Sequence, residues 1–155
     1  MSKKNTPPKP RVFVDADVLF AGAASPTEYG ASLLILRLGE LTLIQAVTSK
    51  QVITEAERNL ATKMPDALPM FRLLVQRALT VIPDPRPEEV AGHVNLADPK
   101  DLPILVAALQ AQCPWLVTFN VRHYRPGHPN VRVVRPGEFI RRVREVLAYL
   151  REETI

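Results

Sequence analysis

The stretch RVFVD, residues 11–15, is a short run of β-branched and aromatic residues that ends in an acid. This pattern predicts a buried β-strand. Similar apolar runs indicate four further strands, at 41–47, 79–82, 115–119 and 131–134. Stretches of denser or helically spaced apolar residues indicate helices at 29–39, 49–64, 67–79, 102–112 and 136–152. Because strands alternate with helices, we expect an α/β fold with a mostly parallel sheet of about five strands, covered by helices on both faces.

Local signals place the ends and faces of these helices. Gly39 is expected to stop the helix at 29–39, and Ser49 is expected to cap the helix that follows. The proline-rich stretch 83–89 is expected to be a loop. Two helices carry clear apolar stripes, the first formed by Val52, Ile53, Ala56 and Leu60, the last by Phe139, Ile140, Val143, Val146, Leu147 and Leu150.

A length of 155 residues suits one domain with one hydrophobic core. We expect residues 1–10 to form a disordered basic tail and residues 11–155 to form that single domain. Cys113 is the sole cysteine, which excludes an internal disulfide bond and suits the reducing cytoplasm. No apolar stretch reaches the length of a transmembrane helix, so no membrane association is expected.

The basic residues are concentrated toward the C-terminus. The net charge is +4, and residues 122–151 contain eight arginines but only two acids, Glu138 and Glu145. Such a segment favours a polyanionic partner such as a nucleic acid. The alternative is an ordinary solvated, charged helix.

Oxygen-bearing side chains follow the predicted strands. Asp15 ends the first strand, Glu55 lies on the helix after the second, Asp98 and Asp101 precede the helix at 102–112, and Asn120 follows the fourth strand. The carboxyl ends of parallel strands share one edge of a sheet, so these groups are expected to lie together. Clustered carboxylates repel one another unless a cation lies among them. Hard oxygen ligands favour Mg²⁺ or Mn²⁺ over Zn²⁺.

Four stretches together resemble the successive motifs of PIN-domain ribonucleases, in the branch of toxin components of toxin–antitoxin pairs. They are VFVDADVLFAGAAS (12–25), TSKQVITEAERNL (48–60), DPKDLPILVAAL (98–109) and LVTFNVRHY (116–124). The resemblance implies a three-layer α/β/α sandwich whose acidic cluster binds one or two divalent ions and hydrolyses RNA phosphodiesters. By motif, Asp15 corresponds to the first acid of the family, Glu55 to the second, and Asp101 with Asp98 to the third.

The chain departs from the family pattern at two positions. An acid is usual where Asn120 stands, and asparagine is common where Asp17 stands. Asn120 can still offer a carbonyl oxygen to a metal or to its water, but it brings no charge. We therefore include Asn120 in the expected site and interpret Asp17 as a helix cap or a turn residue that orients Asp15.

The resemblance also implies partners. RNA is the expected substrate, and Arg122 and Arg125, in the loop after Asn120, are expected to hold its flanking phosphates. An antitoxin protein, a homodimer and a cytoplasmic location follow from the family. His123 and Tyr124 are interpreted as ordinary loop residues.

Three alternative interpretations remain open. Asp101 is well placed as the N-cap of the helix at 102–112, and it can be a cap, a metal ligand or both. The stretch VFVDADV (12–18) also resembles the first motif of haloacid-dehalogenase-like phosphatases, with Asp15 as nucleophile and Asp17 as acid. Finally, Asn120 favours a non-catalytic protein that binds RNA or a partner on a decayed nuclease fold.

Overall fold

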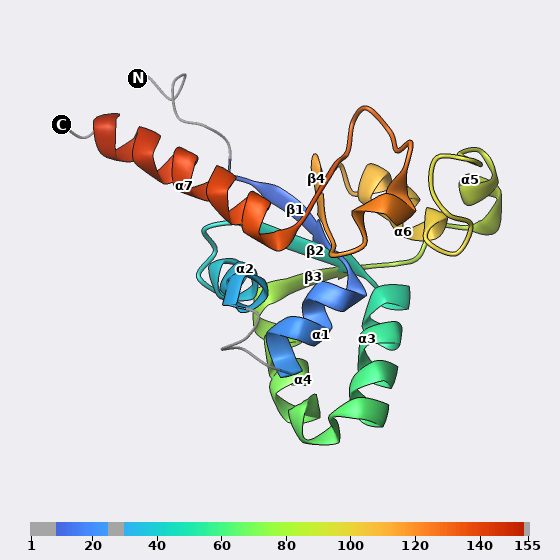
Figure 1. Ribbon diagram of the computed structural model, residues 1–155, viewed down its shortest axis with the longest axis horizontal. Coiled ribbons are helices and arrows are strands. Elements are labelled where there is room, and N and C mark those ends of the chain that lie inside the picture. The colour runs from blue at the N-terminus through green and yellow to red at the C-terminus, as the bar shows by residue number, and fades with distance from the viewer. Residues whose placement is uncertain (1–8, 25–29, 154–155) are drawn as a thin grey trace.

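A five-stranded, all-parallel sheet with the order β3-β2-β1-β4-β5 forms the centre of the protein (Figure 1). The computed structural model describes residues 9–24 and 30–153, with side chains as far as Tyr149. The strands are β1 (Arg11–Val14), β2 (Gln45–Ser49), β3 (Leu79–Ile82), β4 (Trp115–Val117) and β5 (Arg132–Val134). All five lie in or overlap the predicted runs, which confirms the predicted α/β class and the parallel sheet.

In the described part of the chain, six α-helices and two short 3₁₀ turns connect the strands, and a seventh helix follows the last strand. The helices are α1 (Ala16–Ala24), α2 (Gly30–Glu40), α3 (Lys50–Lys63), α4 (Leu68–Ala78), α5 (Pro87–Ala91), α6 (Leu102–Gln110) and α7 (Pro136–Glu153). The 3₁₀ turns are η1 (Pro65–Ala67) and η2 (Val121–Tyr124). Within the described residues, no helix combines the length and the apolar composition that crossing a bilayer requires.

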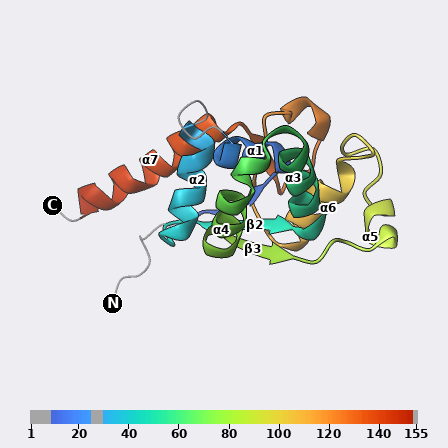
Figure 2. The same ribbon diagram turned by 90° about the horizontal axis from the view of Figure 1, so that it is seen from below.

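The helices form two layers around the sheet. Helices α1 to α4 pack against one another, and α7 packs on α2 (Figure 2). Helix α6 packs instead on β2 and β4. Right-handed crossovers explain this division, because the chain moves outward from β1 to β3 and then returns across β1 to β4, which puts the two sets of helices on opposite faces. The result is the three-layer α/β/α sandwich expected from the sequence.

The strand order reverses beside β1. Its neighbour on one side is β2, with Val12 opposite Ala46, and on the other side β4, with Val12 opposite Trp115. In open parallel sheets, binding sites form outside the carboxyl ends of the strands at such a reversal. The residues that follow β1 and β4 are therefore the ones placed to form a site.

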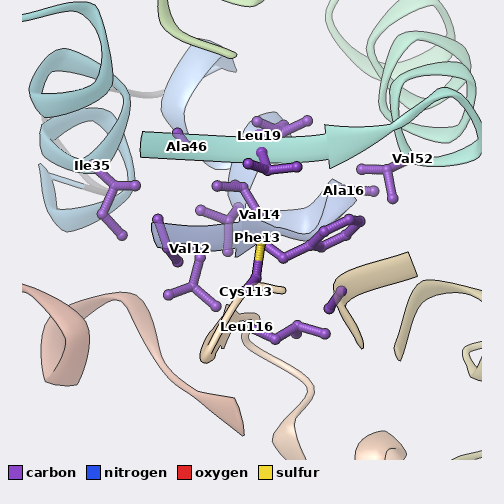
Figure 3. Packing of buried hydrophobic residues seen from close by; sticks show 14 of the residues in the cluster. Val12, Phe13, Val14, Ala16, Leu19, Ile35, Ala46, Val52, Cys113 and Leu116 are labelled. Atoms are coloured by element: carbon purple, nitrogen blue, oxygen red, sulfur yellow. The ribbon is translucent and has the colours of Figure 1, made fainter. Parts of the chain in front are cut away.

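Burial in the core explains why three successive residues of β1 are apolar. Val12, Phe13 and Val14 are fully buried because helices cover both faces of the sheet. Figure 3 shows these side chains packed with Leu116 of β4 and with Cys113, whose sulfur points toward β1. Cys113 is buried, and it acts here as a small apolar core residue.

Several local expectations were wrong. Helix α1 was not predicted, since its side chains are apolar or buried on almost all sides and show no amphipathic stripe. The stretch 83–89, expected to be a loop, contains the start of α5. Residues 41–44 precede β2 instead of belonging to it. The outer half of α7 extends from the domain and leaves Leu147 exposed, although this residue belongs to the predicted stripe.

Two further expectations lie partly or wholly outside the described residues. The predicted disordered tail spans residues 1–10, of which only residues 9 and 10 are described. The side chain of Leu150, the last member of the predicted stripe of α7, is also outside them.

Contrary to the expectation from the sequence, Gly39 does not end the helix, since α2 continues through Glu40 and the left-handed residue after it is Thr42. Gly39 is required for packing instead. It lies in the last turn of α2, where a β-carbon would stand 2.7 Å from the carbonyl oxygen of Ala78 and 3.2 Å from the β-carbon of Ala46. Both neighbours belong to regular elements that pack tightly on α2, α4 carrying Ala78 and β2 carrying Ala46. Glycine therefore allows α2 to approach the sheet and α4 closely.

We expect Gly39→Ala to lower the free energy of unfolding by about 1–3 kcal/mol, because the added methyl group clashes with backbone. This loss should outweigh the gain of up to about 1 kcal/mol that alanine brings inside a helix. Gly137→Ala in α7 is the matched control, since no atom lies within 4 Å of its added β-carbon. Urea denaturation of both variants measures the difference. Equal stability of the two variants would show that the close approach at Gly39 is unimportant.

Candidate functional site

A small polar pocket of about 150 Å³ lies at the carboxyl edge of the sheet, at the reversal of strand order. Its polar lining side chains are Asp15, Asp17, Glu55, Asn59, Lys100, Asp101, Asn120 and His123. Larger cavities, of about 510 and 470 Å³, lie beside α7, and each is lined by a single carboxylate. The concentration of acids, and not cavity size, therefore identifies the candidate site. Its small volume suits an ion better than an organic substrate.

Asp15 lies at the centre of this pocket. It follows β1 directly, it is 6% exposed, and its carbonyl oxygen accepts hydrogen bonds from the N–H groups of Val18 and Leu19 at the start of α1. Its Oδ1 atom accepts a hydrogen bond from the N–H of Ala16 at 2.7 Å. The N-terminus of a helix favours a negative charge. The turn from β1 into α1 therefore both positions and stabilises this carboxylate.

Tyr124 is the second group that holds Asp15. The Tyr124 hydroxyl donates to Asp15 Oδ2 at 2.7 Å, and the tyrosine is 2% exposed. Burial first, and the charge of Asp15 second, raise the pKa of the tyrosine far above its ordinary value, so it stays a neutral donor. Interpreting Tyr124 as an ordinary loop residue was wrong. The sequence gives no local signal for this contact, because η2 brings Tyr124 back over β1 from 109 residues away.

Asp101 occupies the N-cap position of α6, but its side chain makes no capping hydrogen bond. Its Oδ2 atom is buried, and no donor reaches it with hydrogen-bonding geometry, although His123 Nδ1 lies 3.2 Å away. A buried carboxylate oxygen without a well-directed donor is costly. The capping interpretation therefore explains where Asp101 stands but not what its side chain does. The side chain faces the pocket with spare capacity to bind a cation.

Asp98 lies just outside the pocket. It is exposed, and its backbone carbonyl accepts hydrogen bonds from the N–H groups of Asp101 and Leu102. One ligand atom from each of Asp98, Asp101 and His123 lies within 4.8 Å of the others. Asp98 thus shapes the turn before α6, and its carboxylate borders the site from the side of Asp101.

Glu55 reaches the pocket from the second turn of α3. The side chain of Ser49, expected to cap this helix, makes no capping hydrogen bond. Asp84, which follows β3, instead accepts a hydrogen bond from the N–H of Gln51 at 2.8 Å. Lys100 lines the same pocket, and its charge partly offsets the rise that burial and Asp15 cause in the pKa of Glu55 and Asp101. Sequence reasoning missed this lysine, although it stands between two acids, Asp98 and Asp101.

Asp17 and Asn120 form the remaining wall. Asp17 lies in the first turn of α1, and its Oδ2 atom accepts a hydrogen bond from Asn120 Nδ2 at 3.1 Å. The same oxygen accepts hydrogen bonds from the N–H of Phe119 at 3.0 Å and from the hydroxyl of Thr118 at 3.3 Å. Asp17 is therefore not the cap of α1, because its carboxylate is turned toward the end of β4.

The sequence profile of the PIN domain matches residues 11–122, which span β1 to η2. The chain belongs to the PIN-domain family. Among solved structures, the fold is similar to a chain of the VapBC2 complex from Rickettsia felis, described as bound to a DNA fragment from the promoter of its genes. That similarity has a TM-score of 0.58 at 16% identity and covers 79% of this chain and 96% of the other. Among proteins of curated function, none is detectably similar in sequence.

Burial, and then repulsion between the acids, oppose ionisation in the site of this PIN domain. Burial raises the pKa of Asp17 from 3.8 to about 7, and the charge of Asp15 adds to this rise, while hydrogen bonds from Phe119, Thr118 and Val18 oppose it. Burial and then the charge of Asp15 also raise the pKa values of Glu55 and Asp101. Each carboxylate is thus harder to ionise because Asp15 is close. A cation among them would reverse this effect.

The predicted phosphate contacts lie beside the pocket. Arg122 belongs to η2, Arg125 follows it, and both side chains are exposed. Neither lines the pocket itself. The roles of Arg122 and Arg125 in binding RNA, like the metal-binding and catalytic roles of the acids, stay predictions.

The buried hydrogen bond between Tyr124 and Asp15 leads to a prediction about stability. Tyr124→Phe should lower the free energy of unfolding by about 1.5–3 kcal/mol at neutral pH, since a buried charge loses its donor. In an Asp15→Asn background the same substitution should cost less, because a neutral amide accepts a weaker hydrogen bond. Urea denaturation of the four proteins gives both costs. An equal loss in the two backgrounds would mean that the hydroxyl stabilises something other than the carboxylate.

The raised pKa of Asp17 predicts an unusual dependence of stability on pH. The folded protein binds this proton more tightly than the unfolded chain, so stability from Asp17 is present below about pH 4 and is lost as the pH rises toward about 7. In EDTA, wild type should therefore lose more stability between these pH values than Asp17→Asn does. Thermal or urea melts across this range measure the two slopes. Parallel curves would exclude Asp17 as the titrating group.

Proposed function

We propose that this PIN domain is a metal-dependent endoribonuclease that hydrolyses phosphodiester bonds of RNA with Mg²⁺ or Mn²⁺. The observation that supports this most strongly is the shared pocket of Asp15, Glu55 and Asp101, in which burial and then the charge of Asp15 raise the pKa of the other two acids. Carboxylates that raise one another's pKa in this way destabilise the metal-free protein. Binding of a divalent cation would offset that cost and so explain why the fold brings them together.

The residues present fit a hard divalent cation. Asp15, Glu55 and Asp101 would hold it, and Asp98 and Asn120 border them. The buried Oδ2 of Asp101 lacks a well-directed donor, so it is the oxygen atom most available to act as a metal ligand. The donors are mainly oxygen atoms with one imidazole, which favours Mg²⁺ or Mn²⁺ over Zn²⁺. When bound, such a metal lowers the pKa of a coordinated water and offsets charge on a scissile phosphate.

The protein groups around the acids would complete the reaction. The donors Tyr124 and Ala16 hold both oxygens of Asp15 in fixed directions, which maintains the geometry of the centre. Lys100 is exposed at the rim and is placed to contact a phosphate oxygen. Arg122 and Arg125 would bind flanking phosphates, which positions the strand without selecting a base sequence.

The partners are part of the same proposal. The net charge of +4 and the basic C-terminal segment suit RNA as the substrate. One solved structure of similar fold is a VapBC2 complex, and we propose by analogy that this PIN domain is the toxin of a toxin–antitoxin pair, acting as a homodimer in the cytoplasm. A small neighbouring reading frame for an antitoxin would support this part of the proposal.

The observations argue against one of the two alternative functions, the phosphatase. In a haloacid-dehalogenase-like phosphatase, Asp15 would be the nucleophile, but both its oxygens accept hydrogen bonds and the chain belongs to the PIN family. A non-catalytic RNA- or partner-binding protein remains the alternative outcome of the experiment below.

The direct test is cleavage of single-stranded RNA by the purified protein. We expect products with Mn²⁺ or Mg²⁺, none with EDTA, and none from Asp15→Asn, because this variant loses the central charge of the metal site. Calorimetry with Mn²⁺ should show binding by wild type and strongly reduced binding by Asp15→Asn. Cleavage that persists in EDTA would disprove the proposed chemistry, and RNA binding without cleavage would favour the non-catalytic alternative.

A matched control separates substrate binding from metal binding. Arg122→Ala/Arg125→Ala should weaken RNA binding and reduce its salt dependence by about one unit of log–log slope per lost phosphate contact. Its affinity for Mn²⁺ should stay at the wild-type value, since both side chains lie outside the pocket. An unchanged salt slope would exclude these arginines as phosphate contacts.

A further inference from the structure

The two positions at which the chain departs from the PIN pattern are in direct contact. Asp17 and Asn120 are 103 residues apart in the sequence, and Asn120 Nδ2 donates to Asp17 Oδ2 at 3.1 Å. One position of the pair holds a carboxylate and the other an amide. In the PIN motifs an amide is common at position 17 and an acid is usual at position 120. In this chain the two groups have exchanged positions.

The contacts of Asp17 hold its carboxylate in one orientation. Its Oδ2 accepts from Asn120 Nδ2, from the N–H of Phe119 and from the hydroxyl of Thr118. Thr118 Oγ1 in turn accepts a hydrogen bond from the N–H of Asn120 at 3.1 Å, which fixes the whole turn after β4. The other carboxylate oxygen, Oδ1, has a longer contact of 3.5 Å with Thr118 Oγ1. Oδ2 therefore anchors the carboxylate, which the N–H of Val18 also contacts, and the group lines the pocket.

Asp17 is also in the right place for such a role. It lines the same pocket as Asp15, Glu55 and Asp101, and its charge interacts with that of Asp15. Asn120 is the more exposed member of the pair, whereas Asp17 is partly buried beside the acids. A carboxylate at position 17 thus adds its charge to the same cluster that an acid at position 120 would join.

We infer that Asp17 is the fourth carboxylate of the metal centre and that Asn120 is a positioning residue, which holds Asp17 through its side-chain amide. This inference rests on the proposed metal-dependent function. It reverses the roles that the sequence alone suggests, in which Asn120 belongs to the site and Asp17 only orients Asp15. Under this inference Asn120 is not evidence of a decayed site, because Asp17, its hydrogen-bond partner, supplies the carboxylate instead.

Four proteins test the exchange: wild type, Asp17→Asn, Asn120→Asp and the double variant Asp17→Asn/Asn120→Asp. The readout is Mn²⁺ affinity by calorimetry, which does not depend on cleavage. Asp17→Asn should weaken Mn²⁺ binding about 10-fold or more, the loss typical when a group that tunes a metal site is removed. The double variant should recover most of that affinity, because it restores one carboxylate and one amide in contact.

Melting curves in EDTA provide the structural control. Asp17→Asn should melt at or above the wild-type temperature, since it removes a charge that Asp15 repels. Asn120→Asp should melt below wild type, because it places a second carboxylate against Asp17. The double variant should return toward wild type. If Asp17→Asn alone does not fold, Asn120→Asp decides, since a second carboxylate in this pair should raise the affinity for Mn²⁺, and an unchanged affinity would contradict the inference.

The outcomes separate this inference from the proposed function. If Asp15→Asn loses Mn²⁺ binding while Asp17→Asn keeps wild-type affinity, Asp17 only anchors the turn, and the inference is wrong while the function stands. If Asp17→Asn loses affinity but the double variant does not regain it, position 120 is not equivalent and the exchange is wrong. If wild type binds no Mn²⁺, both the proposed function and the inference fail.

Discussion

A buried carboxylate at the end of the central strand is the constraint on which the site depends. Asp15 is 6% exposed and stands where β1, α1 and the turn after β4 meet. Its charge is held by the hydroxyl of Tyr124 and by the N–H of Ala16, at the N-terminus of α1. After burial, this charge is the largest cause of the raised pKa values of the acids around it. The metal-free fold thus contains a local repulsion that a bound cation would relieve.

The sheet concentrates these acids, and neutral groups from distant segments then orient them. Tyr124 reaches Asp15 from η2, and Thr118 reaches Asp17 from the end of β4. Glu55 depends on the position of α3, whose first turn is capped by Asp84 from the neighbouring strand connection. Donors of this kind fix the direction of a carboxylate while leaving its negative charge available. A metal centre needs that combination of fixed geometry and retained charge.

Membership of the PIN family identifies the fold and the edge of the sheet at which the site lies. It does not say how well the acids of this particular chain would bind a metal. By motif position alone, an amide stands at Asn120 where the resemblance leads one to expect an acid. By contacts, this amide donates a hydrogen bond to the carboxylate of Asp17. The two descriptions differ because a motif treats each position separately, whereas the field in a pocket depends on the sum of the charges that line it.

The sequence by itself determined the parallel sheet, the helical layers and the edge at which the acids gather, because apolar periodicity and strand–helix alternation are local signals that packing reinforces. It also placed Asp15, Glu55 and Asp101 at that edge, Asp15 because it directly follows a strand and the other two by their motifs, and the three line one pocket. Only the tertiary structure decided that the side chain of Asp101 makes no capping hydrogen bond, that Tyr124 holds Asp15 and that Asp17 contacts Asn120. Those contacts join segments about 100 residues apart, and their hydrogen bonds depend on side-chain directions that no local pattern encodes.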